Sequence, residues 1–159
     1  MKKAFRNMLM ITAFGVVAAL GVLAYIRLAP SDPAVWHVSP VTAAEAGQGA
    51  CVDSIATLIN GARVACLSTD APETLLSRLD QTALATPRTT RLAGTPQTGR
   101  ITWITRSLLM GYPDYTTAQV TQTPTGARLD IYARQRFGAS DLGVNTARLK
   151  DWLGKSTFQ

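Results

Sequence analysis

Arginine side chains recur in the second half of the sequence at spacings that suit the recognition of an anion. In the segment 127–137 polar and apolar residues alternate, so on a β-strand Arg134 and Arg136 share one face. Two guanidinium groups on one face form a fork-shaped donor array that suits a carboxylate, a phosphate or a sulfate. Arginines of neighbouring segments can extend this array. The candidate binding face comprises Arg88, Arg91, Arg106, Arg134 and Arg136.

Carboxylates near these arginines support a structural interpretation of the same pattern. Asp114, Asp130 and Asp141 lie close to the arginines in the sequence. Exposed ion pairs of this kind are common and contribute little to stability. We favour structural ion pairs or a solvated surface, and we keep a site for an anion or an acidic partner as the alternative.

Five further polar residues are candidates for binding. Asn145 falls on the apolar face of a predicted helix, where a buried amide needs hydrogen-bond partners at both ends, so we expect a structural lock rather than a ligand contact. Tyr112 and Asp114 belong to a GYPDY turn, which could form a recognition surface, although packing is the favoured interpretation. Ser140 or Asp141 is expected to cap the helix that follows.

The sequence contains no recognisable catalytic motif. His37 is its one histidine, and a general base needs a held partner and a nucleophile within hydrogen-bond reach. Patterns such as GxSxG, HExxH, paired carboxylates and a redox CxxC are missing. We therefore assign no catalytic residue and expect a structural histidine. We also predict no cofactor and no metal site, because two cysteines and one distant histidine are a poor ligand set.

Cys51 and Cys66 admit two interpretations. A disulfide is favoured if the domain is exported. Asn60-Gly61, however, predicts a two-residue hairpin turn that would place Cys66 opposite Ile55. Cys51 would then lie roughly 13 Å from Cys66, beyond the distance of about 7 Å between Cα atoms that a disulfide tolerates. We slightly favour the hairpin, and we keep the disulfide for a wider turn.

The segments between these residues predict an α+β fold. Residues 71–85 read as a capped helix, with an apolar face made of Leu75, Leu76, Leu79, Ala83 and Leu84. Strands rich in Thr, Ile, Val and aromatic residues are predicted at 88–94, 100–109, 116–123 and 127–137. A second helix is predicted over 142–155, with an apolar side made of Leu142, Leu149, Trp152 and Leu153. We expect an antiparallel sheet with helices packed on one face.

An apolar segment at the N-terminus predicts attachment to a lipid bilayer. Residues 7–26 contain no charged side chain and cover roughly 30 Å as a helix, the thickness of a hydrocarbon core. A cleaved secretory signal, cut after Ala24, is the alternative, but the run is longer than such signals usually are. Basic residues precede the run, which places the N-terminus in the cytoplasm and the rest of the chain outside it.

The net charge of +6 results mainly from basic residues that flank the apolar segment, and it does not indicate nucleic-acid binding. Four of the 16 basic residues flank the apolar run, and the remainder of the chain carries 12 basic and 10 acidic residues, a net charge of only +2. Binding of nucleic acid needs a concentrated basic surface. We therefore exclude DNA and RNA as partners.

Four segments together resemble a known family. They are DPAVWHVSP at 32–40, TPRTTRLAG at 86–94, ITWITRSLLMGYPDY at 101–115 and DIYARQRFGASDLGVNTARLKDWL at 130–153. They are similar to the family catalogued as domain of unknown function 1499, although the segment from Cys51 to Cys66 departs from its pattern. The resemblance implies membrane-anchored or exported bacterial proteins, with related plastid proteins and no established activity. The positions that match its motifs are Arg88, Arg91, Arg106, Tyr112, Asp114, Arg134, Arg136, Ser140, Asp141 and Asn145.

These observations predict a single-pass protein of the bacterial inner membrane. Residues 1–28 would form the anchor, 29–50 an extended stalk that lies over the domain, and 51–159 a periplasmic α+β domain. The leading hypothesis is a non-enzymatic accessory or binding module that docks on a membrane-protein complex, energy-transducing or otherwise, or on an anionic ligand through the Arg-rich face. The alternative is a small envelope enzyme in which arginines orient an anionic substrate while Asp114, Asp141 or His37 moves protons.

Overall fold

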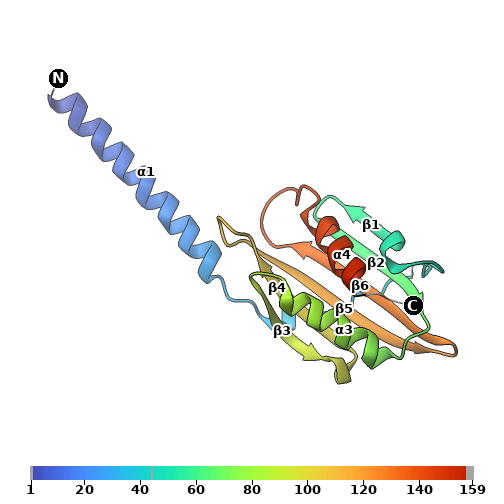
Figure 1. The fold of residues 1–159 in the computed structure, drawn as a ribbon. Helices are drawn as coiled ribbons and strands as arrows, with labels where there is room; N and C mark the ends of the chain where they lie inside the picture. Colours follow the sequence, from blue (N-terminus) through green and yellow to red (C-terminus); the bar gives the residue numbers. More distant parts are fainter. Residues whose placement is uncertain (1, 44, 157–159) are drawn as a thin grey trace.

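The computed structural model describes residues 2–43 and 45–156, and it begins with a long helix that projects from the rest of the molecule (Figure 1). This helix, α1 (Lys2–Leu28), is long and apolar enough over Lys3–Leu28 to cross a membrane. Most of its side chains are exposed, but Ile26 and the following Ala29 are each only 5% exposed. The last turn of α1 is therefore packed against the domain, while the rest of the helix is free of it.

A six-stranded antiparallel sheet forms the centre of the domain, with the order β1-β2-β6-β5-β4-β3. Its strands are β1 (Ile55–Leu58), β2 (Gly61–Ser68), β3 (Thr89–Thr95), β4 (Arg100–Arg106), β5 (Pro113–Thr123) and β6 (Gly126–Gln135). Thr123 pairs with Gly126, so Pro124-Thr125 makes the turn between the two longest strands. The predicted α+β class and the antiparallel arrangement are confirmed.

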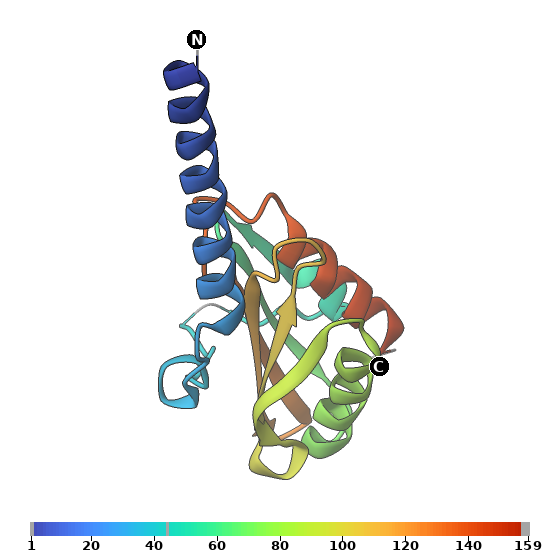
Figure 2. The ribbon, with the colours of Figure 1, turned by 90° about the vertical axis from the view of Figure 1, so that its left-hand side faces the viewer.

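Two helices cover one face of the sheet, as Figure 2 shows with the sheet turned nearly edge-on. They are α3 (Pro72–Ala85) and α4 (Val144–Lys155). Between them and the sheet lies an apolar core in which Trp103 and Trp152 meet edge to face, with ring centroids 5.6 Å apart. We call this the helix face of the sheet.

The opposite face is covered by the segment 29–42, which we call the linker (Figure 2). The linker contains one short helix, α2 (Pro33–Trp36), whose first turn is capped by the Asp32 side chain. Trp36 stacks on Tyr115 of β5 with ring centroids 3.8 Å apart. We call this surface of the sheet the linker face.

Two predicted apolar contacts are wrong. Leu84 is 44% exposed, because it lies at the edge of the α3 face that is buried. Leu142 is 90% exposed, because α4 begins only at Val144 and Leu142 belongs to the preceding loop. The N-cap of α4 is Gly143, although the Asp141 carboxylate still accepts hydrogen bonds from the backbone N–H groups of Gly143 and Asn145.

The hairpin and the disulfide coexist, so the expectation that they exclude each other is wrong. Ile55 pairs with Val64, which makes Ile59-Asn60 the turn instead of Asn60-Gly61. Before β1 the chain forms a 3₁₀ helix, η1 (Cys51–Ser54), which rises less per residue than a strand and turns Cys51 back over β2. The Cα atoms of Cys51 and Cys66 are 5.3 Å apart and the two residues are joined by a disulfide.

Candidate functional site

The linker face carries the arginines that alternation along β6 predicts, but they bind the chain's own backbone. Arg134 Nη2 donates to the Trp36 carbonyl at 2.6 Å, and Arg136 Nη1 donates to the Pro30 carbonyl at 2.8 Å. Burial lowers the pKa of the Arg134 guanidinium. Within the described residues neither arginine has a carboxylate partner. The predicted anion array is thus occupied by carbonyl groups of the linker.

Three more arginines hold the linker in the same way. Arg100 donates to the His37 carbonyl at 3.3 Å, Arg63 to the Pro40 carbonyl at 3.0 Å and Arg128 to the Thr42 carbonyl at 3.2 Å. We call Arg63, Arg100, Arg128, Arg134 and Arg136 the linker clamp. Reasoning from the sequence missed Arg63, Arg100 and Arg128, because nothing local shows that a segment of 14 residues crosses their strands.

His37 is held on the linker face, and within the described part of the chain the side chain that its ring contacts is a threonine, not an acid or a nucleophile activated by one. Its Nδ1 lies 2.9 Å from Thr102 Oγ1, which in turn lies 2.9 Å from Thr117 Oγ1. Burial, and then the positive charge of Arg100, lower the pKa of His37 below its usual value of 6.5. The histidine is a hydrogen-bonded link between the linker and two neighbouring strands.

The other predicted arginines lie elsewhere. Arg91 forms an ion pair with Asp80 of α3 on the helix face, and Asp80 also accepts from Trp103 Nε1 at 2.8 Å. Arg88 Nε donates to the Arg106 carbonyl at 3.1 Å, and Arg106 Nη1 donates to the Gly111 carbonyl at 3.0 Å. The five arginines of the predicted array therefore fall into three separate groups.

The remaining candidates meet at a pocket on the helix side of the sheet, at the end where α1 joins the domain. Tyr112, Asp114, Ser140 and Asp141 line it together with Phe137. We call it the motif pocket, because its lining derives from the GYPDY and RFGASD strings. Its full lining is Ser107, Tyr112, Asp114, Gln135, Phe137, Gly138, Ser140, Asp141, Leu142 and Val144.

A buried charge network forms the base of the motif pocket. Asp114 accepts from Arg148 Nη2 at 3.0 Å and from Asn145 Nδ2 at 3.4 Å, and Arg148 Nη1 donates to Asn145 Oδ1 at 2.5 Å. Burial raises the pKa of Asp114, the Arg148 charge opposes this effect, and Asp141 adds to it. Asn145 is fully buried and joins α4 to β5, the structural role expected for it.

Arg148 is the residue of this network that sequence reasoning missed. A usable signal existed, since Arg148 follows Asn145 by three residues and therefore lies on the same side of a helix. The acidic partner could not be assigned in the same way, because Asp114 is 34 residues away.

Aromatic contacts connect the motif pocket to α1. The Phe137 ring lies 6.1 Å from Tyr112 and 6.1 Å from Tyr25, measured between ring centroids. In Figure 1 the loop after β6 lies at the end of the sheet that receives α1. Residues from the apolar helix and from the motif pocket thus form one continuous cluster.

The two carboxylates named in the enzyme hypothesis are not assembled with its arginines. Tyr115 and Arg134 are paired in the sheet, and both side chains belong to the linker face. Asp114 and Gln135 form the neighbouring pair. Because successive side chains of a strand point to opposite faces, this pair belongs to the helix face. Asp114 and Asp141 are therefore on the other side of the sheet from Arg134, Arg136 and His37.

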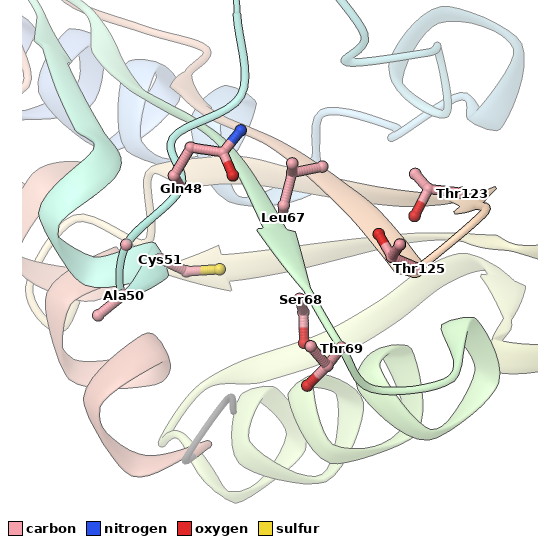
Figure 3. Close-up of a pocket in the computed structure, with 9 residues that line it drawn as sticks. Gln48, Ala50, Cys51, Leu67, Ser68, Thr69, Thr123 and Thr125 are labelled. Carbon is pink, nitrogen blue, oxygen red and sulfur yellow. The ribbon is translucent and has the colours of Figure 1, made fainter.

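A larger pocket lies at the opposite end of the sheet, beside the disulfide (Figure 3). The close-up shows its lining side chains coming from the segment before η1, from β2 and from the β5–β6 turn. The lining is Gln48, Gly49, Ala50, Cys51, Leu67, Ser68, Thr69, Thr123 and Thr125, none of which is charged. This pocket holds no acid, base or cation that could activate its hydroxyl groups.

An apolar helix followed by an antiparallel α+β domain defines the class of this protein. Residues 41–155 match the model of the family described as "Protein of unknown function (DUF1499)", and the chain belongs to this family. The match includes the motif pocket and begins just before the linker ends.

Other comparisons add no activity. No curated protein matches the chain. Among solved structures, protein MLL2253 from Mesorhizobium loti is 15% identical to the chain, with a TM-score of 0.46. That alignment covers 59% of this chain and 93% of the other.

Proposed function

We propose that this protein is a membrane-anchored, non-catalytic accessory module that docks on a membrane-protein complex through the motif pocket and its apolar border. The proposal places α1 in the bacterial inner membrane, with the N-terminus in the cytoplasm and the domain in the periplasm. The observation that carries it is the location of the motif pocket directly beside the last turn of α1, through the contact between Phe137 and Tyr25. A ligand in this pocket would lie at the membrane surface.

The junction between α1 and the domain supports a retained anchor. Arg27 Nη2 donates to the Leu109 carbonyl at 2.7 Å, and Ile26 is buried against the domain. The linker that follows is held by the five arginines of the linker clamp. A segment that serves only as a cleaved signal needs no such contacts.

A fixed junction also supports docking by weak contacts. Because the linker is bound along the sheet, the domain cannot move far from the bilayer, and its effective concentration toward a neighbouring membrane protein is high. A partner with a segment at the membrane surface would therefore be bound even if each contact is weak.

The border of the motif pocket has the chemistry of a protein-binding surface. Ile59, Leu142 and Val144 are 76%, 90% and 52% exposed, and the Asp141 N–H donates to the Ile59 carbonyl at 3.1 Å, which holds the two loops together. We call these three residues the apolar rim. Leu142 has a φ of 51°, a left-handed conformation that is strained for a leucine. Clustered exposed apolar side chains next to polar groups are typical of binding sites for other proteins.

Site-specific photo-crosslinking tests this proposal. A photoreactive amino acid replaces Leu142 in the full chain, and in a matched variant it replaces Leu84, which is 44% exposed on α3. We expect crosslinks to a discrete membrane protein from position 142 and none to that protein from position 84. The same pattern from both positions, or no crosslink from position 142, would exclude docking through the apolar rim.

Mass spectrometry of the membrane fraction tests the anchor separately. The proposal requires the intact N-terminal segment on the mature protein. A mature chain that starts at Tyr25 would show that the segment is a cleaved signal and would overturn the anchored module.

A further inference from the structure

Three arginines surround a second pocket at the junction of α1 and the domain. Arg27 comes from the last turn of α1, Arg88 from the turn just before β3 and Arg106 from the end of β4. They line the pocket with Thr90, Ser107, Leu108 and Gly111. We call it the basic pocket. Its lining contains no carboxylate, so a positive potential is expected there.

The three guanidinium groups are positioned by backbone carbonyls. Arg27 binds the Leu109 carbonyl, Arg88 binds that of Arg106, and Arg106 binds that of Gly111. A guanidinium has five N–H donors, and each of these side chains makes one hydrogen bond to the described residues. None of the three forms an ion pair within the described part of the chain. Donors therefore remain for an anion that contacts all three.

Arg88 adopts a backbone conformation that is rare for its residue type. Its φ is 61°, in the left-handed region that favours glycine. Strained residues of this kind persist where the surrounding structure holds them and are frequent at binding sites. The conformation allows Arg88 to reach the end of β4 and join the basic pocket.

The β4–β5 loop presents apolar side chains next to this charge. Leu108 and Leu109 are 71% and 80% exposed, and the loop that carries them is closed by a hydrogen bond from the Gly111 N–H to the Ser107 carbonyl at 3.2 Å. In Figure 1 the tip of this loop reaches the final turns of α1. Exposed leucines beside arginines are the pattern of a segment that lies in the membrane interface.

We propose that the basic pocket binds the phosphate of an anionic phospholipid while Leu108 and Leu109 insert among the acyl chains. The inference rests on the proposed anchoring of α1. The lipid is favoured over a soluble phosphate because Arg27 belongs to the helix that crosses the bilayer, so the pocket opens where headgroup phosphates are concentrated. The bound lipid would orient the domain and present the apolar rim along the membrane surface.

Fluorescence quenching in nanodiscs tests this inference with the full chain. The described residues contain no free cysteine, so Leu109→Cys provides one site for an environment-sensitive dye. Quenchers attached to the lipid near its headgroup report insertion of the loop. We expect stronger quenching in nanodiscs that contain phosphatidylglycerol than in nanodiscs of phosphatidylcholine alone. Equal quenching in both would overturn the inference.

A charge-matched pair of variants identifies the pocket. Arg88→Gln removes one positive charge from the basic pocket, and Lys150→Gln removes the same charge from an exposed position on α4. We expect Arg88→Gln to lower the ratio of inserted to withdrawn loop by about fivefold and Lys150→Gln to leave it unchanged. Equal effects of the two variants would mean that only net charge matters and would contradict a specific pocket.

Two further measurements separate the lipid site from a soluble-anion site and test the membrane anchor itself. Inorganic phosphate is added to the nanodiscs, and we expect the quenching to persist; its loss would indicate a soluble-anion site instead of a lipid site. Before the quenching measurements, extraction of the membrane fraction with alkaline carbonate tests whether the protein is embedded in the bilayer. Release of the protein by carbonate would overturn the anchor itself, whereas a retained protein with lipid-independent quenching would overturn only the lipid site.

Discussion

The two faces of the sheet use charged side chains in opposite ways. On the helix face, Arg91 pairs with Asp80 and Arg148 pairs with Asp114. On the linker face, five arginines bind the backbone carbonyls of the linker, and among the residues that the structure describes only Arg128 also has a carboxylate partner, Asp130. An irregular segment that crosses a sheet has carbonyl groups without secondary-structure partners, and guanidinium groups satisfy them.

This difference shows why an Arg-rich strand is weak evidence for a ligand. The same alternation along β6 would be found whether the arginines bind a soluble anion or the chain itself. It also implies that the faces should respond differently to mutation. The helix face contains the apolar core of the domain, whereas the linker is held mainly by hydrogen bonds, so we expect it to open locally before the sheet unfolds.

The largest effect is expected from breaking the ion pair on the helix face. Arg148→Met leaves the Asp114 carboxylate buried beside Asp141 without a cation, and we expect it to lower the free energy of unfolding by about 3–5 kcal/mol. Urea unfolding of the full chain in detergent micelles measures this change.

A double variant provides the control for that measurement. Asp114→Leu combined with Arg148→Met removes both charges, and we expect it to recover more than half of the loss. A loss below about 1 kcal/mol in the single variant would show that the pair is effectively solvated.

A smaller and local effect is expected on the linker face. Arg134→Met removes the donor to the Trp36 carbonyl, and we expect the free energy of opening the linker to fall by about 1.5–3 kcal/mol while the sheet stays folded. Hydrogen exchange of the Trp36 and His37 amides, which are bonded to the Asp32 and Pro33 carbonyls, measures this opening.

The matched control is Arg78→Met on α3, which removes an arginine from an exposed ion pair and should leave the linker amides unchanged. If Arg134→Met accelerates exchange equally in the linker and in the central strands, the two faces are not independent and the comparison fails.

The smallest effect is expected from pH, with opposite signs on the two faces. The pKa of His37 is lowered in the folded protein. The contribution of His37 to stability is therefore present above pH 6.5 and is lost as the pH falls through the folded-state pKa. The pKa of Asp114 is raised in the folded protein. The contribution of Asp114 to stability is therefore present below pH 3.8 and is lost as the pH rises through the folded-state pKa.

Between pH 7 and pH 5 we therefore expect exchange of the linker amides to increase, after correction for intrinsic rates, while the helix face does not loosen. His37→Gln should remove the pH dependence of the linker, because glutamine does not titrate and can still bond to Thr102. A linker that responds to pH equally with and without His37 would exclude this histidine as the cause.

Predictions from the sequence succeeded where the signal is local. Composition and the periods of two and 3.6 residues indicate the apolar helix, the two later helices, the face of β6 that carries Arg134, and the buried Asn145. They do not indicate α2, which falls in the segment expected to be an extended stalk. Errors occurred at boundaries. The start of α4 moved from Leu142 to Val144, and the β1–β2 turn moved by one residue toward the N-terminus.

The sequence by itself determined which side chains share a strand or helix face, because backbone geometry sets those periods within a few residues. Only the tertiary structure decided what those side chains contact. Arg134 meets a carbonyl 98 residues away, and Arg27 meets one 82 residues away. Such contacts depend on which strands become neighbours and on where the linker crosses them, and both result from packing of the whole chain rather than from any local pattern.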